Sequence, residues 1–440
     1  MKKLVSLLLV ALLLVGSVAA VAEGGKTKVV FWYSLGGTNA EVIASMVEAF
    51  NASQDKIEVD AQYQGEYDDA INKLKAASLG GEKLPFDIVQ SYEIGSRSII
   101  DSNQMVPVQQ YIDKTGFDIS VIEPNLLAYY TIDGTINSMP FNCSTPLMYY
   151  NKTAFDEAGI TEIPTTVDGI LAVAEKLATY DKDGKLDRSG FTFSNYGWFF
   201  EQWTGKMGRE YVNNGNGRES YATAVAFDQN GAALDLFKMW EKVANSPYTI
   251  NLDKGGTSEA RAAFVAGKTA IFLASTANLA GVLANVGDAF EVGTAFFPYV
   301  NEDDKGGVST GGGTLWMVNS GDDARMDASW EFIQYMINPE NQAVWNARTG
   351  YFPINMKAHD TETFKENIAK FPQFQTALDQ LHASSPEYVG SLLSVFPEVR
   401  KYVEDVTEKV ILKTLTPEQA VEELTRLAND AIEMYNLTNY

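Results

Sequence analysis

The sequence predicts an α/β protein built as two lobes. Near its start a strand, a helix, a strand, a helix and a strand follow one another, which is the order of βαβ units around a parallel sheet. Residues 1–22 have the pattern of a signal peptide, so roughly 418 of the 440 residues remain in the mature chain. A chain of this length exceeds what one hydrophobic core usually organises, and we therefore expect two lobes.

The first part of the mature chain contains the clearest elements. β-branched and aromatic residues in "TKVVFWYS" predict a strand buried on both faces. A helix follows, because Val42, Met46 and Phe50 repeat at four-residue spacing. "KIEVDAQYQ" then predicts a second strand, "YDDAINKLKAASLG" a second helix that ends at glycines, and "FDIVQSY" a third strand.

In the remainder of the chain, predicted strands and helices alternate less regularly. "PLMYYN", "KTAIFLAS" and "FEVGTAFFPYV" predict strands, and "TVDGILAVAEKLATY" predicts a helix. "DARMDASWEFIQYMI" predicts an amphipathic helix that ends at Asn338 and Pro339. In the last predicted helix Thr416 is the cap, Pro417 takes the first helical position and Gln419 completes a capping box.

The first 22 residues predict export. Lys2 and Lys3 precede an apolar run from Leu7 to Val15, and small residues lead to a cleavage point before Glu23. The run is too short for a membrane span, and no later segment approaches ~18 uninterrupted apolar residues. Because no cysteine stands at the cleavage point, no lipid anchor is expected. The mature protein is expected in the periplasm or another extracytoplasmic compartment.

Charge and residue counts argue against several classes of protein. The formal net charge is −23, which does not favour binding to nucleic acid or to an anionic membrane surface. Cys143 is the only cysteine, so an intramolecular disulfide is excluded. His359 and His382 have no cysteine or carboxylate at ligand spacing, which argues against a zinc site and a histidine-dependent triad. No cofactor or metal is expected.

Two phosphate-binding motifs are missing from the sequence. There is no GxxxxGKS/T phosphate loop and no GxGxxG after a strand. "DKDGKLD", residues 181–187, lacks the glycine and glutamate positions of a calcium loop and predicts an Asp-Gly hairpin turn. A carboxylate pair of a glycoside hydrolase stays open, because 57 acidic residues allow many pairs.

Aromatic residues concentrate in segments that resemble loops interrupted by glycine. "SNYGWFFEQWTG" places Tyr196, Trp198 and Trp203 beside Gly197 and Gly205. A tyrosine in "QGEYDD" and a glutamate in "SYEIGS" lie at or just beyond the ends of predicted strands. Strand ends form the ligand crevice of open α/β sheets, and aromatic faces suit a sugar or a polyol. The pattern favours a binding protein over an enzyme.

Four longer segments resemble a known family. They are "PFNCSTPLMYYNKTAFDEAGI", "ARAAFVAGKTAIFLAS", "GGGTLWMV" and "PENQAVWNARTGYFPIN", and they follow the order of the family-1 extracellular solute-binding proteins of ABC importers. The resemblance covers nearly the whole mature chain. It implies the periplasmic-binding-protein fold, with two α/β lobes, a three-crossing hinge and a ligand cleft between the lobes. It also implies a small-molecule ligand, delivery to ABC importer membrane subunits, no enzymatic activity and a monomer.

The same resemblance divides the chain between the lobes. One lobe is expected to comprise residues 23–141 plus 296–338, and the other residues 145–292 plus 340–440. "PFNCSTPLMYYNKTAF" then contains the first crossing. We expect Cys143 to be a buried, inert neighbour of the hinge and Ser144 to contact the ligand.

Within the family, the chain is most similar to the receptors for sn-glycerol 3-phosphate and its diesters. This implies high-affinity binding of a phosphorylated polyol. A receptor for a neutral sugar or oligosaccharide stays open as an alternative, and a secreted glycoside hydrolase as a further one. The ligand contacts implied by the resemblance are Tyr67, Glu93, Ser144, Trp198, Ser275, Gly312, Tyr351 and Arg400. Trp203 is the other candidate for the aromatic contact.

The chemistry of this set suggests a role for each part. Arg400 offers a planar fork of donors that suits a phosphate, and serine and tyrosine hydroxyls with the Gly312 N–H can complete the hydrogen bonds of the anion. A carboxylate would repel a phosphate. We therefore expect Glu93 at the opposite end of the ligand, where it and Tyr67 orient the polyol hydroxyls.

Overall fold

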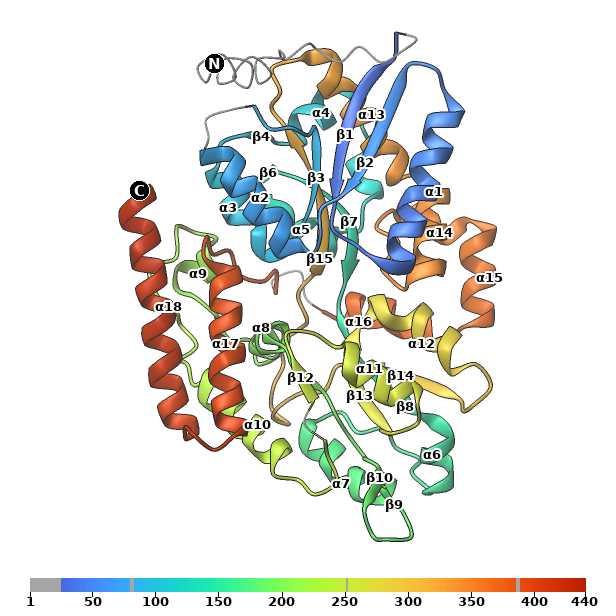
Figure 1. Ribbon diagram of the computed structural model, residues 1–440, viewed down its shortest axis with the longest axis vertical. Coiled ribbons are helices and arrows are strands. Elements are labelled where there is room, and N and C mark those ends of the chain that lie inside the picture. The colour runs from blue at the N-terminus through green and yellow to red at the C-terminus, as the bar shows by residue number, and fades with distance from the viewer. Residues whose placement is uncertain (1–24, 80–82, 251, 385–387) are drawn as a thin grey trace, which may run out of the picture.

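Two α/β lobes lie one above the other along the longest axis of the molecule (Figure 1). The computed structural model describes residues 25–79, 83–250, 252–384 and 388–440. The predicted signal peptide therefore lies outside the described residues. None of the described helices combines the length and the apolar character that crossing a membrane requires.

The upper lobe contains a mixed six-stranded sheet in the order β2-β1-β3-β15-β4, with β7 also paired to β15. Its strands are β1 (Thr27–Tyr33), β2 (Ile57–Tyr63), β3 (Ile88–Tyr92), β4 (Met105–Val106), β7 (Met139–Ser144) and β15 (Gly311–Val318). β1 is parallel to β2 and to β3, whereas β15 is antiparallel to its three neighbours. The predicted βαβαβ order at the start of the chain is confirmed.

Helices cover both faces of this sheet and the surface beside it. They are α1 (Gly37–Ser53), α2 (Tyr67–Leu79), α3 (Ser96–Asp101), α4 (Gln109–Thr115), α5 (Pro124–Tyr130), α13 (Asp323–Met336) and α14 (Pro339–Thr349). The apolar positions that predicted α1 are buried, among them Val42, Met46 and Phe50. α13 ends just before Asn338, and Pro339 begins α14, as expected from the break in the pattern.

The lower lobe is organised around a small antiparallel sheet with β8 at its centre. Its strands are β8 (Pro146–Asn151), β13 (Ile271–Ser275) and β14 (Val292–Phe296), which confirms the three predicted strands. The surrounding helices are α6 (Lys152–Glu157), α7 (Val167–Leu177), α8 (Gly197–Lys206), α9 (Asn213–Gly217), α10 (Ala232–Ala244), α11 (Ser258–Val265), α12 (Leu279–Val286), α16 (Gln373–Ala383), α17 (Phe396–Ile411) and α18 (Pro417–Asn439).

Two local predictions in the lower lobe can be compared with the structure. The helix expected through Tyr180 ends at Leu177, because Thr179–Tyr180 and Leu186–Arg188 form the hairpin β9–β10 around the predicted Asp-Gly turn. The capping box at the start of α18 is confirmed. Thr416 Oγ1 accepts from Gln419 N at 3.3 Å, and Gln419 Oε1 accepts from Thr416 N at 3.0 Å.

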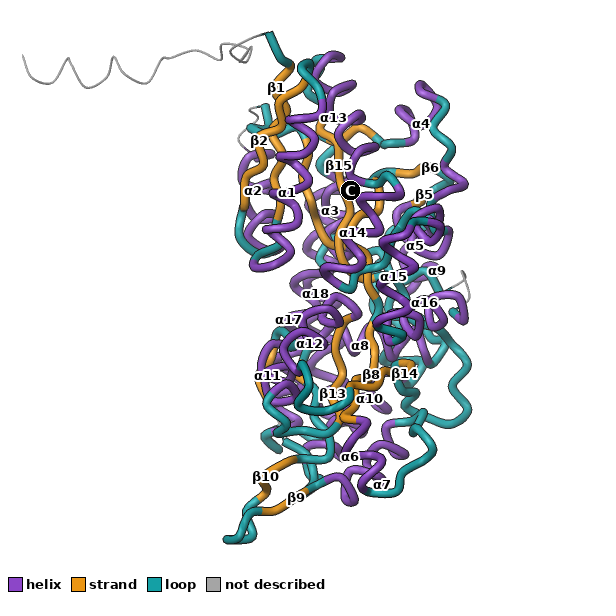
Figure 2. The backbone as a smooth tube through the Cα atoms, turned by 90° about the vertical axis from the view of Figure 1, so that its right-hand side faces the viewer, coloured by secondary structure: helices purple, strands orange, loops and turns teal. Residues whose placement is uncertain are grey.

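The chain passes between the lobes at several points that lie close together (Figure 2). β7 leads into β8 through Thr145, and residues 297–310 lead from β14 to β15. A further passage runs from α13 through α14 and α15 (Glu362–Lys370) to α16. Gln380 on α16 donates to Thr145 Oγ1 at 3.1 Å and to Pro146 O at 2.7 Å, so this helix braces the first passage. The residue boundaries of the lobes stay a prediction, because α14 packs against both α1 and α12.

Candidate functional site

A cavity of about 290 Å³ lies between the lobes. Its wall contains every ligand contact that the sequence predicted: Tyr67, Glu93, Ser144, Trp198, Ser275, Gly312, Tyr351 and Arg400. One end of the cavity continues into a wider groove of about 1100 Å³, and Asn39, Arg261 and Ala277 line both spaces. We call this end the outer end, and the end at Arg400 and Glu93 the inner end.

Strand ends bring the upper-lobe residues to the cavity. Tyr67 begins α2 after β2, and Glu93 directly follows β3, so both lie beyond the carboxyl ends of parallel strands. Ser144 is the last residue of β7 and lies opposite Gly311 of β15. Gly312 has a φ of +92°, and a Cβ there would lie 2.2 Å from Asn142 O, so only glycine fits this position.

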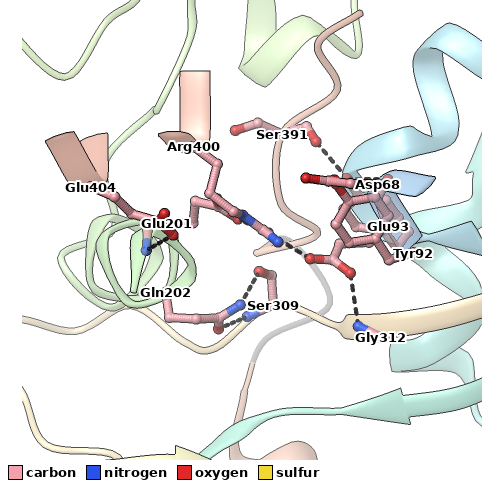
Figure 3. Close-up of polar contacts among 12 residues, drawn as sticks. Asp68, Tyr92, Glu93, Glu201, Gln202, Ser309, Gly312, Ser391, Arg400 and Glu404 are labelled. Carbon is pink, nitrogen blue, oxygen red and sulfur yellow. Dashed lines mark hydrogen bonds and ion pairs between the residues drawn. The ribbon is translucent and has the colours of Figure 1, made fainter. Parts of the chain in front are cut away.

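Arg400, on α17, is held by two carboxylates at the inner end (Figure 3). Its Nε and Nη2 donate to Glu201 at 2.7 Å each, and Nη2 also donates to Glu93 Oε1 at 2.7 Å. At most one-tenth of each of the three side chains is exposed. The Glu93 contact joins the two lobes, because Glu93 belongs to the upper lobe and α17 to the lower.

Burial and charge act in opposite directions on this network. Burial alone would lower the pKa of Arg400, but Glu201 and Glu93 raise it well above its ordinary value, so the guanidinium stays charged. Burial raises the pKa of Glu201 to about 7, although Arg400 counteracts part of the rise. One guanidinium thus faces two carboxylates, and the group has a net charge of −1 when both are ionised.

The position of Glu93 corrects the expected division of the ligand. Glu93 does not lie opposite Arg400, because the two side chains form an ion pair at 2.7 Å. Glu93 Oε2 also accepts from the Gly312 N–H at 2.8 Å, so a protein carboxylate already uses the amide expected to hold the phosphate. A buried arginine needs such partners, since a charge left unpaired out of water is costly. Nη1 of Arg400 has no acceptor among the described residues and remains available to a ligand.

Hydroxyl donors surround the rest of the cavity. Tyr67 Oη accepts from Asn142 Nδ2 at 2.7 Å, which leaves the O–H of Tyr67 free to donate. The ring of Tyr67 stacks on that of Tyr92, with 4.8 Å between the ring centroids. Burial raises the pKa of Tyr351 to about 12, so its hydroxyl also stays protonated. Ser275 Oγ accepts from Ala277 N at 3.1 Å and likewise keeps a hydrogen to donate.

The predicted aromatic contact lies on a helix and not in a loop. "SNYGWFFEQWTG" was expected to be loop-like, but most of it forms α8, and the expectation was wrong because its aromatic side chains pack into the lower core. Trp203 is fully buried there and donates to Pro298 O at 3.0 Å. Trp198 lines the cavity, and its buried Nε1 has no partner within the described structure. The geometry therefore favours Trp198 over Trp203.

The family follows from comparison with known proteins. A model of the family "Bacterial extracellular solute-binding protein" matches residues 45–373, well over half of the chain. The chain belongs to this family.

Individual relatives of this solute-binding protein cover nearly its whole length. The sn-glycerol-3-phosphate-binding periplasmic protein UgpB of Pectobacterium atrosepticum is 27% identical over 421 residues, which are 93% of this chain and 92% of the relative. UgpB of Escherichia coli is 28% identical over 441 residues, 98% of this chain and 97% of the relative.

Solved structures share the two-lobed fold of the solute-binding protein. UgpB from Mycobacterium tuberculosis in complex with glycerophosphocholine matches with a TM-score of 0.76 at 20% identity, over 94% of this chain and 100% of that one. The maltose/maltodextrin-binding domain MalE from Bdellovibrio bacteriovorus, bound to maltotriose, matches with a TM-score of 0.75 at 18% identity, over 92% and 100%. These similarities confirm the predicted fold.

Cys143 and His382 are two side chains of the solute-binding protein whose residue types often serve in catalysis. Cys143 is fully buried, and burial raises the pKa of its thiol to about 12, so it stays protonated. His382 Nε2 lies 3.1 Å from Glu123 Oε2, a partner distant in sequence that the spacing argument could not find. Within the described ranges no cluster of three or more histidine, cysteine or acidic residues could hold a metal.

Sequence reasoning missed two charged residues of the site. Glu201 lies within the quoted aromatic segment, but a single glutamate in a helix carries no signal of an ion pair. Arg261, on α11, lies within the quoted segment "ARAAFVAGKTAIFLAS" and lines the outer end of the cavity. Arg261 lies on the helix that precedes the strand ending at Ser275, a predicted ligand contact, and this position was the signal that could have indicated it.

Proposed function

We propose that this solute-binding protein binds sn-glycerol 3-phosphate or a glycerophosphodiester outside the cytoplasm and delivers it to the membrane subunits of an ABC importer. One observation carries the proposal. The eight contacts implied by the resemblance come from distant parts of the chain, yet all of them line one cavity between the lobes. Two UgpB relatives that match more than nine-tenths of the chain support the same ligand class.

The cavity has donors and acceptors for both parts of such a ligand. Four hydroxyls, those of Tyr67, Ser144, Ser275 and Tyr351, can donate to phosphate or polyol oxygens. Arg400 can donate through Nη1 while Nε and Nη2 stay bound to the carboxylates. Each oxygen of Glu93 has one protein donor and can accept a further hydrogen from a ligand hydroxyl.

We propose that ligand release opens the lobes as rigid bodies around the passages at Thr145 and residues 297–310. Hinges of this kind absorb the backbone change in a few residues. The Arg400–Glu93 pair crosses between the lobes, so opening of the lobes as rigid bodies must separate the two side chains. The protein is proposed to act as a monomer without catalysis, after export and cleavage of residues 1–22. The proposed lobes are residues 23–141 plus 296–338 and residues 145–292 plus 340–440.

A receptor for a neutral sugar or oligosaccharide is the second candidate. It is favoured by the charge at the inner end, where Glu93 and Glu201 already neutralise Arg400. The groove of about 1100 Å³ beside the cavity also has room for further sugar units. Net charge in the cavity is thus the property that separates the two candidates.

Titration calorimetry of the purified mature chain tests the proposal. We expect saturable binding of sn-glycerol 3-phosphate and glycerophosphocholine, and no heat of binding with maltotriose at the same concentrations. Mass spectrometry of ligand carried through purification should identify a phosphate ester. Binding of maltotriose alone would support the neutral-sugar receptor, and product release from a glycoside panel would support a hydrolase.

A further inference from the structure

The two arginines on the cavity wall differ in their partners. Arg400 is almost fully buried and is paired with two carboxylates. Arg261 is half-buried, and no acidic side chain in the described part of the chain lies within ion-pair distance of it. Its Nη1 donates only to the side-chain amide oxygen of Asn278, at 3.1 Å. Arg261 therefore carries a positive charge that the protein itself does not neutralise.

The surroundings of Arg261 provide neutral hydrogen-bond donors. Ser275 ends β13, and its hydroxyl hydrogen is free because Oγ accepts from Ala277 N. Asn278 Nδ2 donates to Ser275 O at 3.3 Å and retains a second hydrogen. Ser275 and Asn278 line the cavity together with Arg261. Glu66 is the acidic residue that lines the adjoining groove, and it forms no pair with Arg261.

The elements that carry these groups are firmly packed. Ala260 and Phe264 of α11 are fully buried, on either side of Arg261 in sequence. Tyr149 Oη donates to Ser275 O at 2.7 Å from the central strand β8. The backbone at Arg261 and Ser275 is thus held by the packing of α11 and β13 before any ligand arrives, and such preorganisation favours binding.

We infer that Arg261, Ser275 and Asn278 form an anion subsite at the outer end of the cavity, and that Arg261 holds the phosphate of the ligand. The inference rests on the proposed function and assigns an orientation within it. The polyol points toward Glu93 and Tyr67 at the inner end, where carboxylate oxygens can accept from its hydroxyls. The phosphate lies at Arg261, and the second alcohol of a diester extends into the wide groove. A phosphate monoester and a diester of a polyol therefore use the same subsite.

Three variants of the full mature chain test the subsite. Arg261→Gln removes the charge, Arg261→Lys keeps it, and Arg426→Gln makes the same change in charge at an exposed ion pair on α18. Titration calorimetry uses sn-glycerol 3-phosphate and glycerophosphocholine. We expect Arg261→Gln to weaken binding of both by about 10- to 100-fold, Arg261→Lys to weaken it by less than about tenfold, and Arg426→Gln to leave it unchanged.

Ionic strength adds a second readout. Between ~0.05 M and ~0.5 M salt the affinity of the parent should fall, and the fall should be smaller in Arg261→Gln, because Arg261 is only half-buried. Thermal unfolding of each variant establishes that it is folded. If the parent binds a phosphate ester and Arg261→Gln binds it within about threefold of the parent at both salt concentrations, the subsite is wrong and the proposed function stands. If the parent binds neither ester, both are overturned.

Discussion

The inner and outer ends of the interlobe cavity hold positive charge in opposite ways. At the inner end Arg400 is buried between Glu93 and Glu201, and its fork of donors is largely used by the protein. At the outer end Arg261 is half-buried and lines a wide groove, and among the described residues its guanidinium hydrogen-bonds to one amide oxygen, that of Asn278. The first arrangement orders the structure, whereas the second leaves charge available to a ligand. Position in the cavity, and not residue type, thus decides what an arginine does.

Further polar contacts join the two lobes near the inner end of the cavity. Lys401 pairs with Asp68 at 2.6 Å between α17 and α2. Asp101 of α3 accepts from Ser394 at 2.8 Å, from Tyr435 at 3.1 Å and from Tyr440 at 2.6 Å. The lobes are therefore linked by polar contacts on the side of α17 and α18, while the groove lies on the side of α11, α12 and α14. We expect the ligand to enter from the groove.

The largest effect is expected from Arg400→Ala. The substitution leaves Glu93 and Glu201 buried without their cation, which should cost about 2–5 kcal/mol in binding and should also lower the melting temperature. Because the loss disturbs the whole inner end, a neutral ligand should be affected as strongly as a phosphate ester. Titration calorimetry measures the loss of binding, and thermal unfolding measures the change in melting temperature. Lys401→Ala, which breaks the more exposed ion pair with Asp68, is the control. Unchanged binding of sn-glycerol 3-phosphate would show that the inner end is not part of the site.

A change in pH dependence is expected from Glu201→Gln. Burial raises the folded-state pKa of Glu201 from 4.5 to about 7. Between these two pH values the folded protein keeps a proton on Glu201 that the unfolded chain has lost. The contribution to stability is present below about pH 4.5 and is lost as pH rises through about 7. Urea unfolding gives the free energy of unfolding at pH 5 and at pH 8. The difference between these two free energies should be smaller for Glu201→Gln than for the parent. Equal differences in the two proteins would contradict the assignment.

The smallest effect is expected from Ser275→Ala at the outer end. The variant removes one neutral donor of the proposed anion subsite, which should cost about 1 kcal/mol, or roughly a fivefold loss of affinity. Phosphate esters should be affected and neutral polyols should not. Ser144→Ala removes a comparable hydroxyl from the end of β7 and is the matched comparison. A Ser275→Ala variant that loses affinity equally for charged and neutral ligands would place the phosphate elsewhere.

Much of the molecule could be predicted from the sequence because the signals are local. Hydrophobic periodicity located β1, α1, β2, α2 and β3, and the box formed by Thr416 and Gln419 located the start of α18. The four quoted segments indicated the family, and the contacts that the resemblance implied all line one cavity. Local pattern was less informative for "SNYGWFFEQWTG", since glycines next to aromatic residues suggested a loop where α8 forms.

The sequence by itself indicated the fold class, the family and eight of the residues that line the cavity. Only the tertiary structure decided which charges meet. Arg400 is separated from Glu201 by 199 positions and from Glu93 by 307, and no local spacing reports contacts over such distances. The chain brings these three side chains together in a space shielded from water, where a charge needs a partner. Arg261 stays at the open end, where water and a ligand can reach its charge. The same residue type therefore has two roles, because burial and partners are properties of the folded chain.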